Sequence, residues 1–142
     1  MDVTQLPFNR HIGLELATVE SGSLVTLPAG EQYTNHLGTV HASALLAVVE
    51  AGSGAFLAAQ LGTIAGFVPV VRRLNAKFRK PAIGRVAARA ILADAEVVRW
   101  TSELSKRGRV LAEIPIEVTD DAGEVVLSAT VEWFIARGNV AG

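Results

Sequence analysis

The stretch NHLGTVHASALLAVVEAGSG, residues 35–54, contains the feature that decides the fold. An apolar run begins in the second half of this stretch and continues beyond it. The run is long enough to span a membrane, which takes roughly 20 residues. Glu50 is the only Asp, Glu, Lys or Arg within residues 42–71, and a carboxylate near the middle of a membrane span is costly. We therefore predict that residues 40–60 form a helix buried in protein, and that Gly62 ends it.

Short β-rich segments precede and follow this helix. Alternating patterns and turn residues predict strands over residues 12–19, 23–28, 67–80, 84–92, 109–119 and 124–135. Asp120-Asp121-Ala122-Gly123 is typical of the turn between the last two strands. One or two helical turns are expected at residues 4–11. A second helix is expected at residues 95–106, with Asp94 as its N-cap and Gly108 after its end.

Six strands and one long helix limit how the chain can pack. A helix that is apolar nearly all round needs burial on every side, and one helix cannot cover both faces of such a sheet. The simplest solution is a curved antiparallel sheet wrapped around one long central helix, with a second copy of the chain burying what remains. The sequence thus predicts a single α+β domain over residues 1–142 and an assembly of at least two copies.

Composition narrows the classes of function. The chain has 13 Lys and Arg against 14 Asp and Glu, and this net charge of −1 gives no reason to expect nucleic acid or a membrane as partner. It contains no cysteine, which excludes disulfides, thiolate nucleophiles and cysteine-ligated metals. The N-terminus lacks the regions of a secretory signal, so we expect a cytoplasmic protein. His11 and His36 are too isolated to suggest a metal site.

The polar residues before and within the long helix have a recognisable spacing. His41 follows Asn35 by six positions, Gly38 lies between them, and Glu50 follows His41 by nine. This motif resembles that of the PaaI-like (phenylacetate-degradation) thioesterases and of a related uncharacterised, DUF4442-type branch, both within the hotdog-fold superfamily. The segments LNAKFRKPA and VTDDAGEVVLSATVEWFI also resemble the middle strand and closing hairpin of these proteins. The resemblance implies a hotdog fold and thioester hydrolysis without a cofactor.

Four features depart from the PaaI-like pattern. Ala42 and Ser43 replace the glycines of a His-Gly-Gly motif, and Glu50 stands where many members have Asp. Val71 occupies the position where some members carry Ser or Thr. The predicted helix at residues 95–106 is longer than the usual turn, as in the less characterised branch. These departures bear on the substrate and the rate more than on the fold.

Thioester hydrolysis needs a base or nucleophile and donors for the developing oxyanion. Glu50 is the candidate nucleophile or general base, because apolar surroundings raise a carboxyl pKa toward useful base strength. The alternative is a structural Glu50 that pairs with a buried basic group or faces a water pocket. The resemblance assigns polarisation of the thioester carbonyl to the N–H of Ala42. Eight residues of helix, about 12 Å, separate these two positions, so a site must combine Ala42 of one subunit with Glu50 of another.

The loop before the helix supplies three further candidates, each with two interpretations. His41 either contacts the substrate near the thioester or is a helix-terminal polar residue that bonds the loop. Asn35 either orients water or the carbonyl, or is an ordinary loop residue. The motif places Gly38 beside the substrate. The conformational freedom of glycine instead favours a turn at this position.

A basic stripe on the strand at residues 67–80 supplies the last candidates. Arg73, Lys77 and Arg79 either contact the phosphates of coenzyme A or form a solvated strand face. By the period of two, Arg72 belongs to the opposite face.

The function predicted from the sequence is hydrolysis of a small or medium acyl-CoA, aliphatic or aromatic, by a homodimer or a tetramer of two dimers. A non-catalytic hotdog protein that binds acyl-CoA or a lipid is the alternative, favoured by the missing glycines and Val71. A hotdog dehydratase acting on 3-hydroxyacyl thioesters is a third option, but its arrangement of His and carboxylate is not found in the sequence.

Overall fold

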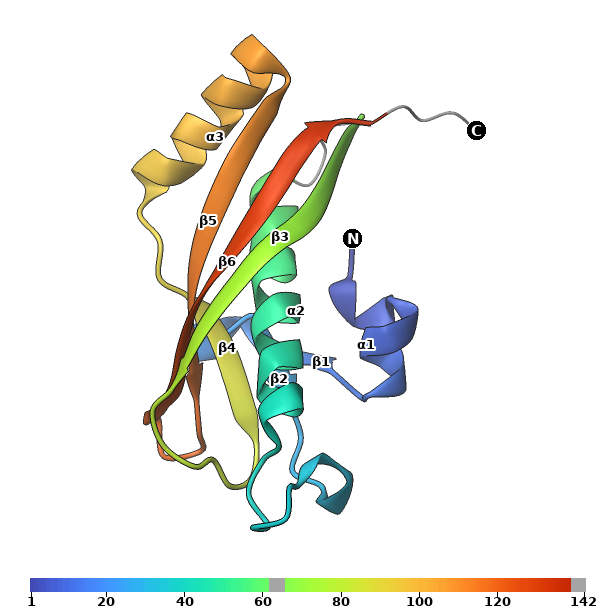
Figure 1. The fold of residues 1–142 in the computed structure, drawn as a ribbon, viewed down its shortest axis with the longest axis vertical. Coiled ribbons are helices and arrows are strands. Elements are labelled where there is room, and N and C mark those ends of the chain that lie inside the picture. Colours follow the sequence, from blue (N-terminus) through green and yellow to red (C-terminus); the bar gives the residue numbers. More distant parts are fainter. Residues whose placement is uncertain (62–65, 139–142) are drawn as a thin grey trace.

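The computed structural model describes residues 1–61 and 66–138 (Figure 1). Its helices are η1 (Val3–Gln5), α1 (Pro7–His11), η2 (Val19–Ser21), η3 (Glu31–Tyr33), α2 (Ala42–Leu61) and α3 (Asp94–Arg107). Its strands are β1 (Glu15–Leu16), β2 (Val25–Leu27), β3 (Phe67–Phe78), β4 (Val86–Ala90), β5 (Arg109–Thr119) and β6 (Val125–Arg137).

The strands form one antiparallel sheet in the order β1-β2-β4-β5-β6-β3. Figure 1 shows the long strands curving across one side of α2, while α1 lies on the other side of this helix. The chain is therefore α+β, with a curved sheet wrapped around one long central helix, which confirms the predicted hotdog fold. Strand β3 is at one end of the order, so its outer edge pairs with no strand of the described residues.

The core lies between α2 and the concave face of the sheet. Alternate residues of β5 are buried, from Val110 through Ile114 to Val118, as expected for a strand with one face on a core. Among the described residues, α2 alone has the length and hydropathy of a membrane span. Its buried face, which includes Val48 and Val49, packs on the sheet.

Glycine allows α2 to approach the sheet closely. A Cβ built on Gly52 would lie 2.7 Å from the Cβ of Ala88 on β4, which is closer than carbon atoms approach in proteins. A side chain at this position would force the helix and β4 apart. Gly52 thus holds α2 at the distance from β4 that positions the rest of the helix.

Several predicted boundaries are wrong. Strands β1 and β2 have two and three residues, fewer than predicted, and the single-turn helix η2 lies mainly at the predicted turn between them. The N-cap of α3 is Ala93, and Asp94 is the first helical residue, where its charge favours the helix dipole. Gly108 ends this helix with a φ of 70°, as predicted. The predicted stop at Gly62 lies outside the described residues.

Strand β3 also contains an irregularity that the period of two does not reveal. A β-bulge lies between Val71 and Arg73 where β3 pairs with β6. A bulge adds one residue to its strand and shifts the alternation of the side chains. The Arg72 guanidinium consequently lies over the Phe134 ring, 5.7 Å from its centroid. Arg72 is therefore on the same face as Arg73, and the prediction of opposite faces is wrong.

Candidate functional site

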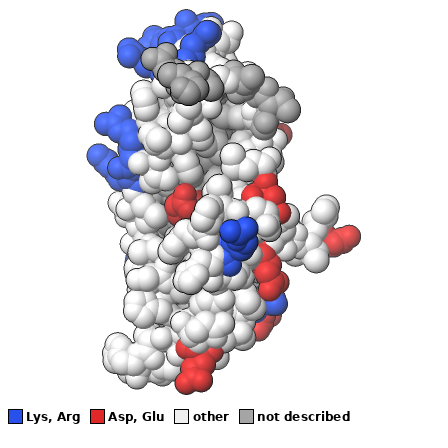
Figure 2. Space-filling model, turned by 90° about the vertical axis from the view of Figure 1, so that its right-hand side faces the viewer, with Lys and Arg blue, Asp and Glu red and all other residues white. Residues whose placement is uncertain are grey.

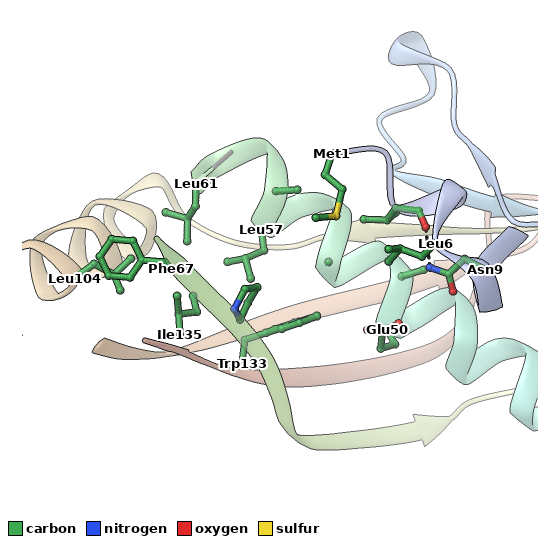
Figure 3. Close-up of a pocket in the computed structure, with 15 residues that line it drawn as sticks. Met1, Leu6, Asn9, Glu50, Leu57, Leu61, Phe67, Leu104, Trp133 and Ile135 are labelled. Atoms are coloured by element: carbon green, nitrogen blue, oxygen red, sulfur yellow. Dashed lines mark hydrogen bonds between the residues drawn. The ribbon is translucent and has the colours of Figure 1, made fainter. Parts of the chain in front are cut away.

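A cavity of about 370 Å³ runs beside α2, and we call it the chamber. Most of its wall is apolar and comes from α2, β3, β6, α3 and the N-terminal segment. Its larger apolar side chains include Leu57, Leu61, Phe67, Leu104, Trp133 and Ile135. Figure 3 shows Glu50 and Asn9 toward one end of the chamber, and Phe67 and Leu104 toward the other. Its volume falls in the range of small-molecule pockets, about 300–1,000 Å³.

Glu50 supplies the only carboxylate among the residues that line the chamber. Its side chain is partly buried, and desolvation raises its pKa above the ordinary value of 4.5. Within the described residues, no basic side chain forms an ion pair with it. The sequence left open a Glu50 paired with a buried basic group, and no such group is found in this part of the chain.

Asn9 lies beside Glu50 and is held by the N-terminal segment. It is buried, and its Nδ2 donates a hydrogen bond to the carbonyl oxygen of Val3 at 2.9 Å (Figure 3). This bond fixes α1 to η1 and so builds the wall of the chamber near Glu50. Sequence reasoning missed Asn9, because only the folded chain brings residues 3–9 beside the middle of α2.

A buried hydrogen-bond pair joins α2 to β6 next to the carboxylate. The Trp133 Nε1 donates to Ser53 Oγ at 2.9 Å, and Ser53 Oγ donates to the carbonyl oxygen of Glu50 at 2.8 Å. The indole of Trp133 lines the chamber. Ser53 therefore positions both the aromatic wall and the helical turn that carries Glu50.

The N-terminus of α2 leaves a backbone donor available. His41 Nδ1 accepts the N–H of Ser43 at 2.9 Å, and the His41 carbonyl accepts the N–H of Leu45 at 3.1 Å. His41 is thus the N-cap of the helix, which matches the helix-terminal interpretation of this residue. Ala42 is the first helical residue and is exposed, and its N–H has no acceptor among the described residues.

Asn35 organises the loop that leads into α2. Its Oδ1 accepts the N–H groups of Leu37 and Thr39, at 2.9 and 3.1 Å, and its Nδ2 donates to Thr39 Oγ1 at 2.8 Å. Gly38 has a φ of 76°, in the left-handed region that favours glycine. Both residues shape the turn before the helix. Neither lines the chamber of its own chain.

The basic stripe of β3 lies on the face of the sheet that points away from α2. Arg73 is opposite Glu132 in the β3–β6 register and Lys77 is opposite Ser128, while Arg79 Nε donates to Ser128 Oγ at 2.7 Å. The structure does not bring these three basic residues into the chamber. Figure 2 shows a face that is largely uncharged, with basic residues gathered at its top and upper left edge and acidic residues mainly along its right side and at its bottom.

A family model described as a domain of unknown function, DUF4442, matches residues 2–135. The chain belongs to this family. The DUF4442 chain is similar to PA5026 from Pseudomonas aeruginosa, described as a probable thioesterase. That match has 26% identity and a TM-score of 0.79, and covers 96% of this chain and 91% of the other.

Two further solved structures share the fold of this DUF4442 member. OLEI01261 from Chlorobaculum tepidum has 23% identity, a TM-score of 0.79 and coverage of 94% and 88% of the two chains. BH2602 from Bacillus halodurans, crystallised with CoA, has 24% identity, a TM-score of 0.61 and coverage of 78% and 65%. A comparison with curated proteins gives no match. The family and the fold place the chain in the hotdog thioesterase superfamily.

Within the described residues, no group of three or more His, Cys, Asp and Glu side chains is placed to hold a metal ion. The chemistry that the site offers is that of a carboxylate in apolar surroundings and a helix N-terminus. A carboxylate of raised pKa acts as a base or nucleophile, and a free N–H at a helix N-terminus stabilises developing negative charge.

Proposed function

We propose that this DUF4442 protein is an acyl-CoA thioesterase in which Glu50 is the catalytic carboxylate. The observation that carries the proposal is a single, partly buried carboxylate of raised pKa in the wall of a mostly apolar cavity. Such a carboxylate lowers the stability of the fold when it is ionised, and no ion pair among the described residues offsets that cost. The similarity to a probable thioesterase from Pseudomonas aeruginosa supports the same reaction.

In the proposed reaction, Glu50 removes a proton from water as the oxygen adds to the thioester carbonyl carbon. The N–H of Ala42 stabilises the oxyanion of the tetrahedral intermediate. The intermediate then collapses with cleavage of the carbon–sulfur bond, and the proton passes from Glu50 to the departing sulfur. The products are a carboxylic acid and coenzyme A. Direct attack by the Glu50 oxygen, followed by hydrolysis of the resulting anhydride, gives the same products.

We propose that the two groups come from different subunits of a homodimer. Ala42 and Glu50 are eight residues apart on one straight helix, about 12 Å, which is too far for both to contact one thioester. The unpaired edge of β3 offers a surface for a second copy, since Val68, Val70 and Val71 are 48%, 48% and 38% exposed. An exposed apolar edge strand of this length favours pairing with another chain.

Thiol release from a panel of acyl-CoAs tests the proposed reaction. Glu50→Gln should abolish turnover while the circular dichroism spectrum stays unchanged, and Glu20→Gln, at an exposed position on η2, should be as active as the wild type. Full activity of Glu50→Gln would contradict the mechanism. Tight acyl-CoA binding without thiol release would instead favour a non-catalytic binding protein. This is the second candidate because the methyl group of Ala42 lies beside the N–H that would stabilise the oxyanion.

Subunit mixing tests the shared site. Ala42→Pro removes the N–H at the first helical position, where proline is well tolerated, and should inactivate the enzyme without unfolding α2. Co-refolding Ala42→Pro with Glu50→Gln produces heterodimers in which one of two sites has both groups. With half of the dimers mixed, activity should recover to about a quarter of the wild-type value. No recovery, with heterodimers demonstrated by mass spectrometry, would contradict a site built from two subunits.

A further inference from the structure

The chamber extends along α2 from Glu50, not across the helix. Both Glu50 and Leu61 line it, so it follows the helix for eleven residues, or about 16 Å. The wall opposite is the indole of Trp133 and the side chain of Ile135 (Figure 3). A ligand that reacts beside Glu50 and fills this space must therefore be long and apolar.

Two side chains of the chamber wall, those of Trp133 and Val3, pack closely against Gly54 beside Glu50. A Cβ built on Gly54, one turn further along α2, would lie 3.6 Å from the Trp133 ring and 3.8 Å from a methyl carbon of Val3. These are ordinary van der Waals contacts, so the Trp133 ring and Val3 pack directly over Gly54 and form the wall of the chamber at this point.

The far end of the chamber is formed by α3. Leu104 is 1% exposed and lines the chamber near Phe67. The helix is held against α2 by Trp100, whose ring meets that of Phe56 edge to face at 6.4 Å between centroids. Because Trp100 and Leu104 are both buried, α3 forms a fixed wall.

We propose that the chamber binds an extended, apolar acyl chain of about ten to twelve carbons, with Leu104 at its methyl end. This inference rests on the proposed thioesterase function. An extended chain advances about 1.2 Å per bond, as three backbone bonds span up to about 3.6 Å. The chamber is about 16 Å long from Glu50 to Leu61, and the Leu61 side chain takes part of this length. The remaining length therefore holds about ten to twelve carbons.

Two neighbouring alanines of α2 provide a matched pair of variants. Ala58 lines the chamber, whereas Ala59 is exposed and does not. A helical side chain covers the turn before its own Cα, so Ala58→Phe places a ring about 6–8 Å beyond Glu50. We expect kcat/KM of the wild type to be highest for decanoyl- or dodecanoyl-CoA and low for phenylacetyl-CoA. In Ala58→Phe, the ratio of dodecanoyl to hexanoyl turnover should fall about tenfold or more, while Ala59→Phe keeps the wild-type ratio.

A binding measurement distinguishes a failure of this inference from a failure of the proposed function. Dodecanoate should bind the Glu50→Gln protein in a calorimetric titration, and adding Ala58→Phe should abolish that binding. If wild type releases no thiol but dodecanoate binds in this way, the reaction is wrong and the acyl chamber stands. If thiol is released with no preference for chain length, or if Ala58→Phe and Ala59→Phe behave alike, the chamber assignment is wrong and the thioesterase stands. Leu104→Ala, if it folds, should move the optimum to longer chains.

Discussion

Two glycines of α2 face different surroundings, and matched alanine substitutions would show which of the two the packing of the helix requires. A Cβ on Gly52 would lie 2.7 Å from the Cβ of Ala88, whereas a Cβ on Gly54 would make its closest contact at 3.6 Å, to the Trp133 ring. We predict that Gly54→Ala stabilises the protein and that Gly52→Ala does not.

The magnitude follows from two terms. Replacing Gly by Ala inside a helix gains about 0.5–1 kcal/mol, because Gly loses more conformational freedom on folding. This gain is common to both variants and cancels in their difference. Carbon atoms pack best at about 3.5–4.0 Å, so Gly52→Ala must move α2 or β4 by about 1 Å, and overpacking of this kind costs about 1–3 kcal/mol. The free energies of unfolding of the two variants should therefore differ by about 1–3 kcal/mol.

Urea denaturation at one protein concentration measures this difference, since the concentration affects the stability of any oligomer. The m-values should agree, so that the midpoints report stability alone. Equal loss of stability in both variants would refute the packing described for Gly52.

Two further predictions concern the groups around the chamber. Because burial raises the pKa of Glu50 above 4.5, its ionisation at neutral pH destabilises the fold; Glu50→Gln should have the higher Tm at neutral pH, and this advantage should vanish as the pH falls below the ordinary glutamate pKa. A constant difference in Tm from neutral to acidic pH would contradict the desolvation of Glu50. Ser53→Ala leaves the buried Trp133 N–H without its acceptor and should cost about 1–3 kcal/mol in urea denaturation, whereas the exposed Ser105→Ala should change stability by less than about 0.5 kcal/mol.

The sequence predicted those parts of the fold that a local pattern determines. Burial alternates along β5, and β6 follows the same period, so both strands could be located from their side chains to within a few residues. The apolar run predicted α2 with its start two residues early. One failure has a local cause as well. The bulge at Arg72 interrupts a strand pattern with a residue that is compatible with a strand.

The candidate site was predictable only where one residue stood out. Glu50 could be identified because no other charge lies near it in the sequence, and it does line a cavity. The bond between Ser53 and Trp133 joins residues 80 positions apart, and Leu104 reaches the chamber through the packing of α3. Such contacts depend on the tertiary structure and leave no period or spacing in the sequence.

Three residues of α2 lower the stability of the helix, and packing on the sheet explains only one of them. Gly52 has a packing reason, since any larger residue would collide with β4. Glu50 and Gly54 have none: an ionised carboxylate is disfavoured by burial, and a methyl group at Gly54 would fit. Alanine or leucine at both positions would favour the helix. Both residues lie in the wall of the chamber, and local departures from the most stable choice are expected where a site, not the fold, sets the requirement. The carboxylate and the glycine beside it are therefore best explained together, by the chamber whose wall they share and not by the stability of the helix.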